Sequence, residues 1–216
     1  MMGARGLYRT AMADLDMIRE RDPSILSRTE ALLHPAVVAI WGYRVAHRTH
    51  LRGLRRTARL MSTVARVVSG GIEIHPGARI GRRFLIDHGT GVVIGETAVI
   101  GDDVTIFHQV TLGSVGWWHD QGRPEGTRRH PEVGDRVVIG ANATLLGAIT
   151  VGPDAVIGAQ ALVIRDVASG ARVLAPIAEP RPRRTHRTQN HRRRAPVAAD
   201  RARRDHDNTS VTFPTW

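Results

Sequence analysis

Acidic and imidazole side chains that could handle protons or a metal ion lie close together in one part of the chain. Between Gly71 and Gly113 the sequence contains Glu73, the pair Asp87-His88 and a second histidine, His108. Carboxylates and imidazoles are the groups that proteins use for general acid–base catalysis, and several imidazoles together can hold zinc. Whether these groups meet depends on the elements that carry them.

An aliphatic residue recurs at every sixth position in this part of the chain, with two extra residues inserted at Asp87-His88. A helix has a period near 3.6 and a single strand a period of 2, so neither explains a period of six. Hexapeptide repeats of this kind predict a β-helix, and we expect a left-handed parallel one. The aliphatic positions are Ile74, Ile80, Ile86, Ile94, Ile100, Ile106, Leu112, Val133, Ile139, Leu145, Val151, Ile157 and Val163.

In such a fold each hexapeptide makes one flat side and three sides close one coil, with coils roughly 4.8 Å apart. Counting hexapeptides places Ile106 one coil above Ile86, so His108 is expected beside His88. Glu73 is expected at the end of the same side, one coil lower. The pattern therefore predicts a cluster of carboxylates and imidazoles at one edge of the prism.

Residues 1–70 are expected to form a small α-helical N-terminal domain. The apolar spacing predicts a helix that stops at Asp22, before Pro23, and a second helix from Pro35 with Val38, Trp41 and Val45 facing inward. A third helix is predicted to end at Gly70-Gly71, and its apolar face comprises Leu54, Ala58, Met61, Ala65 and Val68. For Asp22 taken alone, a helix stop or cap is the simplest interpretation.

The prism is predicted to occupy residues 71–179, interrupted by an extruded loop at 114–132. This loop contains glycine, proline, charges and the adjacent Trp117 and Trp118, and loops on a rigid scaffold often build functional sites. Residues 180–216 are too polar and charged to fold alone, so we expect an Arg-rich disordered tail.

Composition limits the classes of protein that need be considered. The formal net charge is +11, but ten of the 31 basic and three of the 20 acidic residues lie in the tail, which therefore carries +7 of it. Aromatic residues are not interleaved with the basic ones, so nucleic-acid binding is not expected. With no cysteine, no signal-type segment and no apolar run long enough to cross a bilayer, we expect a cytoplasmic protein without a membrane partner.

The strings GIEIHPGARIG, FLIDHGTGVVIGETAVIGDDV, VTLG and RRHP resemble the serine O-acetyltransferase family, collinearly over about residues 10–175. The resemblance implies transfer of an acetyl group from acetyl-CoA, as co-substrate, to the hydroxyl of L-serine in cysteine biosynthesis. Glycine and aliphatic repeats alone are much less specific than DHGTGVVIGETAVIG.

The resemblance also implies roles for single residues. His88 matches the catalytic base, and Glu73 matches its acidic partner, where the family often has Asp. Asp22 and Asp87 match the carboxylates that hold the substrate ammonium, and Arg129 and His130 match the residues that grip its carboxylate. Members assemble as trimers with sites between subunits, so His130 of one chain is expected to complete the catalytic site around His88 of another.

Gly113, Ala141 and Ala159 fall where the family's backbone meets the pantetheine arm of CoA. The resemblance implies a homotrimer and leaves a hexamer open, because the helical domain that pairs two trimers in the family is short here. No metal is implied.

This chain departs from the family pattern at three places. Ser114 and an enlarged loop replace the usual TLGGT and the short loop after it. Leu174-Ala175-Pro176-Ile177 replaces GVPA, which affects part of the CoA contact. The family's C-terminal isoleucine is replaced by an ending in Trp216, so the cysteine synthase complex is not expected.

Alternatives remain open at this stage. The acceptor could be another amino acid such as homoserine, whereas a sugar fits the four acceptor-binding charges poorly. A zinc site like that of β-helical carbonic anhydrases would draw on His75, His88, His108, His119 and His130, but the repeat brings only His88 and His108 together. A non-enzymatic trimeric scaffold with the basic tail as its binding arm is the third alternative.

Overall fold

The computed structural model describes residues 4–124 and 126–178. One compact unit ends at Ala175 and contains both the helices and the repeats, so the two expected regions 1–70 and 71–179 share one body up to that residue. The tail expected at 180–216 lies outside the described residues.

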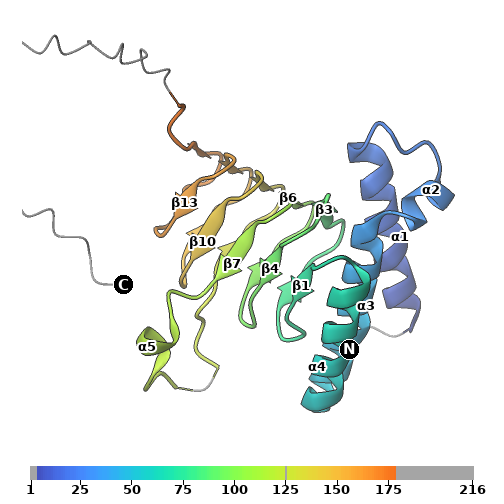
Figure 1. Cartoon of the computed structure of the whole chain (residues 1–216), viewed down its shortest axis with the longest axis horizontal. Coiled ribbons are helices and arrows are strands. Elements are labelled where there is room, and N and C mark those ends of the chain that lie inside the picture. Colours follow the sequence, from blue (N-terminus) through green and yellow to red (C-terminus); the bar gives the residue numbers. More distant parts are fainter. Residues whose placement is uncertain (1–3, 125, 179–216) are drawn as a thin grey trace, which may run out of the picture. The chain divides into compact units, whose positions relative to one another are not determined.

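The N-terminal region is helical, as expected, with its breaks at the predicted turn residues. The first helix ends at Arg21, directly before Asp22-Pro23, and the third begins at Pro35, where a proline at the first helical position needs no hydrogen-bond partner. The helices are α1 (Ala4–Arg21), α2 (Arg28–Leu32), α3 (Pro35–Leu51) and α4 (Arg55–Val68) (Figure 1).

From Glu73 onward the chain forms a parallel β-helix with three sheets, one for each side of the prism. The first sheet orders its strands β1-β4-β7-β10-β13 (Figure 1). The second sheet has the order β11-β8-β5-β2 and the third the order β14-β12-β9-β6-β3. The strands are β1 (Glu73–Ile74), β2 (Arg79–Ile80), β3 (Leu85–Asp87), β4 (Val93–Ile94), β5 (Val99–Ile100), β6 (Thr105–Phe107), β7 (Thr111–Gly113), β8 (Glu132–Val133), β9 (Val138–Ile139), β10 (Thr144–Leu146), β11 (Thr150–Val151), β12 (Val156–Ile157), β13 (Leu162–Val163) and β14 (Arg172–Val173).

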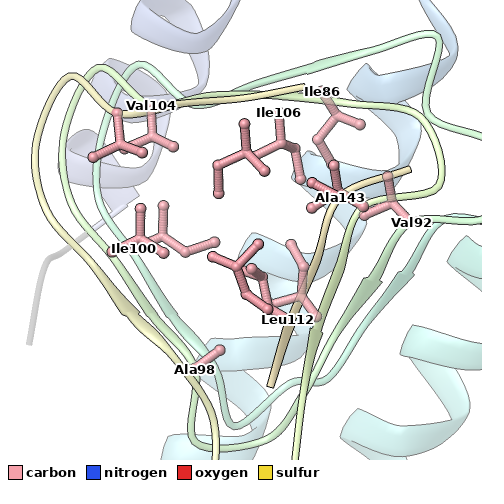
Figure 2. Close-up of a cluster of buried hydrophobic side chains, with 14 of the residues drawn as sticks. Ile86, Val92, Ala98, Ile100, Val104, Ile106, Leu112 and Ala143 are labelled. Atoms are coloured by element: carbon pink, nitrogen blue, oxygen red, sulfur yellow. The ribbon is translucent and has the colours of Figure 1, made fainter. Parts of the chain in front are cut away.

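The repeat positions fill the interior of the prism. Ile100, Ile106 and Leu112 point inward from the three sides of the coil (Figure 2), and all three are at most 2% exposed. The register stacks like on like, with Ile86 beside Ile106 and Ile94 beside Leu112. The predicted fold class, a β-helix of hexapeptide repeats behind a helical N-terminal region, is confirmed.

Hydrogen bonds join the helices to the first coil. Tyr43 of α3 donates its hydroxyl to the carbonyl oxygen of Ala78 at 2.6 Å, and the amide of Phe84, next to β3, donates to the carboxylate of Asp14 in α1. Leu15 and Leu85 belong to one buried cluster. α1 is therefore held against β3, which ends at Asp87 and is followed by His88.

The predicted inward faces of two helices are wrong in part. Trp41 of α3 packs against the core and Ala58 of α4 is buried, as predicted. Val38 and Val45 of α3, however, are 40% and 43% exposed, and Val68 of α4 is 65% exposed. The helices approach closely through small residues instead, since a Cβ on Gly42 would overlap the Cβ of Ala65. Because the two helices pack so closely, the buried face of α3 is the one formed by small residues and Tyr43. The larger aliphatic residues are therefore exposed.

The extruded segment leaves β7 and returns at β8, as predicted, and it contains the short helix α5 (Trp117–Asp120) (Figure 1). No helix in the described ranges is long and apolar enough to cross a bilayer.

Candidate active site

His88 stands at the edge between the third and first sheets, directly after β3. Its backbone is in the left-handed region, with φ 61°, and its side chain is 73% exposed. Seven other described non-glycine residues have the same conformation in turns between strands, so the left-handed turn is a regular feature of this β-helix. In the turn after β3 the imidazole of His88 therefore points away from the prism and into solvent.

Two of the predicted neighbours of His88 are in place. The ring of His108 lies edge-on to that of His88, with centroids 5.7 Å apart, because β3 and β6 pair in register. Oδ1 of Asp87 lies 3.7 Å from Nε2 of His88. The prediction that His108 stacks beside His88 is confirmed.

Asp22 faces the same edge from the end of α1. Its Oδ1 accepts hydrogen bonds from the amide and hydroxyl of Ser24 at 2.9 and 2.6 Å. These bonds lower the pKa of Asp22 below its usual value, and the charges of His34 and His88 lower it further. Asp22 is therefore ionised at neutral pH, and its hydrogen bonds are with Ser24 of its own turn.

Sequence reasoning missed His34, which interacts electrostatically with Asp22, Asp87 and His88. Its Nδ1 accepts the amide of Ala36 at the start of α3, and burial lowers the pKa of its half-buried ring. The signal in the sequence was a polar residue directly before Pro35, the position of a helix cap.

The predicted position of Glu73 is wrong. β1 belongs to the first sheet, whereas β3 belongs to the third, because Ile74 precedes Ile86 by two sides and not by a whole coil. The carboxylate of Glu73 pairs with Arg66 of α4 at 2.7 Å, and in the described structure it makes no hydrogen bond to His88. Glu73 nevertheless lies close to the His88 edge. Its neighbour Ile72 packs so tightly on Gly89, the residue after His88, that a Cβ on Gly89 would overlap the Ile72 side chain.

Arg129 and His130 lie at another edge of the prism, before β8, where the first and second sheets meet. The ring of His130 packs on Gly95, where a Cβ would overlap it, and His130 is 7% exposed. Burial lowers the pKa of His130, and the adjacent charge of Arg129 lowers it further, so the ring is neutral near pH 7. A single chain therefore does not bring His130 and His88 together.

The guanidinium of Arg129 already holds two carboxylates. Nη2 contacts Glu96 at 2.9 Å and Nη1 contacts Asp120 of α5 at 3.1 Å. The guanidinium lies at a cavity of about 500 Å³ between the extruded segment and the prism. The lining residues are His50, Arg55, Gly77, Arg79, Glu96, Thr97, Asp120, Arg123, Pro124, Gly126, Thr127, Arg128 and Arg129.

Thr97 is a second residue that sequence reasoning missed. Its side-chain oxygen accepts the amides of Arg129 at 2.8 Å and His130 at 3.1 Å, and it lies 2.8 Å from Nδ1 of His130. Its place within the GETAVIG string was the only signal in the sequence.

Two of the three residues matched to CoA contacts, Ala141 and Ala159, form part of the His88 edge. The amide of Asn142 donates to the carbonyl oxygen of His108, and that of Gln160 donates to the carbonyl oxygen of Ala141. Ala141 and Ala159 therefore stack above the two histidines on successive coils. Gly113 ends β7 on the adjoining first sheet, paired with Leu146.

Of the five histidines weighed for zinc, the four whose side chains are described lie apart in three places. His88 adjoins His108, His75 adjoins His50 at 6.3 Å between ring centroids, and His130 is at its own edge. Among the described residues no three histidine or carboxylate side chains gather in a way that could hold a metal ion. The zinc alternative finds no support in this geometry.

A parallel β-helix of hexapeptide repeats places the chain among the hexapeptide-repeat proteins. A profile of the family "Bacterial transferase hexapeptide (six repeats)" matches residues 130–165. The chain is 50% identical over 167 residues to serine acetyltransferase of Mycobacterium tuberculosis, covering 76% of this chain and 69% of the relative. It is 49% identical to that of Helicobacter pylori, covering 73% and 88%. The chain belongs to the serine acetyltransferase family.

Solved structures agree with this assignment. Neisseria gonorrhoeae serine acetyltransferase in complex with serine is similar at 39% identity and a TM-score of 0.71, covering 81% of this chain and 68% of that one. Serine acetyltransferase isoform 3 of Entamoeba histolytica, in complex with cysteine, is 34% identical with a TM-score of 0.73. The likeness covers 82% of this chain and 60% of the Entamoeba chain.

Proposed function

We propose that this member of the serine acetyltransferase family transfers the acetyl group of acetyl-CoA to the hydroxyl of L-serine, with His88 as general base. O-acetyl-L-serine formed in this way serves cysteine biosynthesis. The observation that carries the proposal is the exposed imidazole of His88, held in a left-handed turn beside Asp22 and Asp87 in a chain about half identical to serine acetyltransferases.

In this reaction the imidazole of His88 takes the proton from the serine hydroxyl while its oxygen attacks the thioester carbonyl carbon. A new C–O bond forms and the carbonyl π electrons move to oxygen. When the tetrahedral intermediate collapses, the oxyanion re-forms the C=O bond, the C–S bond breaks and the CoA sulfur leaves with the C–S bonding electrons. The imidazolium returns its proton to that sulfur, so His88 ends the cycle neutral.

Four charged or polar residues would hold the two ends of serine. Asp22 and Asp87 are proposed to bind its ammonium group, and both carboxylates already lie at the His88 edge. Arg129 and His130 of a neighbouring copy are proposed to bind its carboxylate, a task suited to a forked guanidinium and a neutral N–H donor.

Glu73 is proposed, on the family resemblance, as the acidic partner of His88. Its ion pair with Arg66 would have to open for this, and its strand already lies one coil below the turn at His88. Gly113, Ala141 and Ala159 are proposed, on the family resemblance, to line the path of the pantetheine arm of acetyl-CoA; Ala141 and Ala159 offer small side chains along the edge above His108, and Gly113 ends β7.

A homotrimer is the proposed assembly. It is supported by the separation of His88 and His130 on different edges of one prism, which leaves each half of the site incomplete in a single chain. A neighbouring copy that placed its His130 edge against the His88 edge of this chain would bring the two halves of the site together.

Release of free CoA thiol from acetyl-CoA by the purified protein tests the proposal, with L-serine, L-homoserine and a sugar supplied in parallel. We expect turnover with serine that falls by about 10²- to 10⁴-fold in His88→Ala. Turnover with homoserine but not serine would show that the segment 114–132 has changed the acceptor. Absence of turnover with every acceptor would favour the non-catalytic scaffold, whose basic tail could then be tested by deletion.

A further inference from the structure

Thr97 lies in the turn between β4 and β5, on the coil next to Arg129 and His130. The register of β5 with β8 pairs Val99 with Glu132, which sets residue 97 beside residue 130. This alignment holds although the extruded segment 114–132 separates the two strands in sequence. The side chain of Thr97 thus meets two residues proposed to bind the acceptor.

The hydroxyl of Thr97 has a complete set of partners. Its oxygen accepts two amide hydrogens, from Arg129 at 2.8 Å and from His130 at 3.1 Å. A hydroxyl carries two acceptor sites and one hydrogen, so only its hydrogen remains for the third contact, Nδ1 of His130 at 2.8 Å. The amide of Thr97 also points to Nδ1, at 3.2 Å.

These contacts determine which ring nitrogen of His130 carries the proton. Nδ1 accepts a hydrogen bond from the amide of Thr97 and another from its hydroxyl. Nδ1 therefore acts as an acceptor and bears no hydrogen of its own. In a neutral imidazole the hydrogen must then be on Nε2. His130 consequently presents an N–H donor and not a free lone pair.

We propose that Thr97 is a positioning residue that orients Arg129 and His130 through their backbone and holds His130 as the Nε2–H tautomer, ready to donate to the acceptor's carboxylate. The inference deepens the proposed function and rests on it. It gives His130 the task of a hydrogen-bond donor and leaves proton abstraction to His88. A threonine that only shaped its own turn would not need contacts with three separate groups of the next coil.

Thr97→Val keeps the shape of the side chain and removes its hydroxyl. Thr97→Ser keeps the hydroxyl, and Thr105→Val is the matched control, because Thr105 is buried on β6 with no hydrogen-bond partner for its Oγ1. We expect Thr97→Val to raise the KM for serine about tenfold, with kcat and the KM for acetyl-CoA nearly unchanged. Thr97→Ser should stay close to the unmodified protein, and so should Thr105→Val.

Equal impairment of the Val and Ser variants, or an unchanged KM for serine in Thr97→Val, would overturn the proposal. So would a fall in kcat at constant KM, because an interaction that only positions the bound carboxylate acts on serine binding.

The tautomer can be measured without turnover, which separates this inference from the proposed function. Long-range ¹H–¹⁵N correlation on protein labelled with ¹⁵N-histidine, with the His130 signal identified by its loss in His130→Asn, should show Nε2–H in the unmodified protein. Thr97→Val should move the signal toward the pattern of exchanging tautomers. If the unmodified protein shows Nδ1–H, the proposal fails even when serine is acetylated; if serine is not acetylated, the tautomer result still decides the role of Thr97.

Discussion

Arg129 shows what a single residue does in this structure. Its two terminal nitrogens hold Glu96, from the turn after β4, and Asp120, from the extruded segment. Both carboxylates occupy donors that the carboxylate of an incoming amino acid would use. On the proposed role of Arg129, an acceptor would displace or share one of these partners.

Asp120→Asn tests this competition at the residue scale. Removing one negative charge from Arg129 should lower the KM for serine several-fold, because the guanidinium is then less fully neutralised. Steady-state kinetics with Asp154→Asn as control should detect it, since Asp154 makes an exposed pair with Arg136 away from the cavity. A raised KM in Asp120→Asn would mean instead that Asp120 holds Arg129 in its binding position.

His75 illustrates the opposite case, a histidine whose environment suits packing. Its Nδ1 accepts the amide of Gly77 at 2.9 Å, and burial lowers its pKa to about 4. A ring that stays neutral and has one nitrogen occupied within its own turn has a structural task, which agrees with its predicted place at a corner of the prism.

At the scale of elements, the joint between the helices and the first coil depends on one buried ion pair. Arg44 of α3 contacts Asp14 of α1 through Nε at 3.1 Å and Nη2 at 3.0 Å. The same guanidinium donates to the carbonyl oxygens of Ile80 and Gly81 at 2.8 and 2.7 Å. α1, α3 and the first coil therefore meet at the side chain of Arg44. Asp22 directly follows α1 and His88 belongs to the β-helix, so these contacts help to align the two residues.

Arg44→Met should lower the free energy of unfolding by about 3–5 kcal/mol, because the carboxylate of Asp14 is left buried without its partner. Arg136→Met, which removes an exposed arginine from its pair with Asp154, should change stability little. Chemical denaturation followed by circular dichroism compares the two variants. Similar small losses in both would show that the buried pair does not secure the joint.

At the scale of the whole molecule, the two halves of the site stand on different edges of one prism. Mixed oligomers of His88→Ala and His130→Ala chains carrying different tags test whether copies share sites. Each variant alone should be nearly inactive, whereas a random mixture should regain about a quarter of the normal activity, because some interfaces then pair an intact His88 with an intact His130. No recovery in purified mixed oligomers would place the complete site within one chain.

The sequence alone was sufficient for the β-helix and for the meeting of His88 with His108. A period of six leaves one regular solution, and equal coil lengths put residues one coil apart side by side. The ends of the helices were predictable for the same local reason, since Pro23 and Pro35 act on their own segments.

Contacts between separate segments were decided by the tertiary structure. Which face of α3 is buried depended on how closely Gly42 lets α4 approach, so the larger residues Val38 and Val45 gave the wrong face. Glu73 pairs with Arg66 because β1 lies on a different side from β3, and Thr97 reaches His130, 33 residues away, through strand register. Periodicity describes one segment at a time, whereas the partners of a polar side chain depend on where another segment brings its own donors and acceptors.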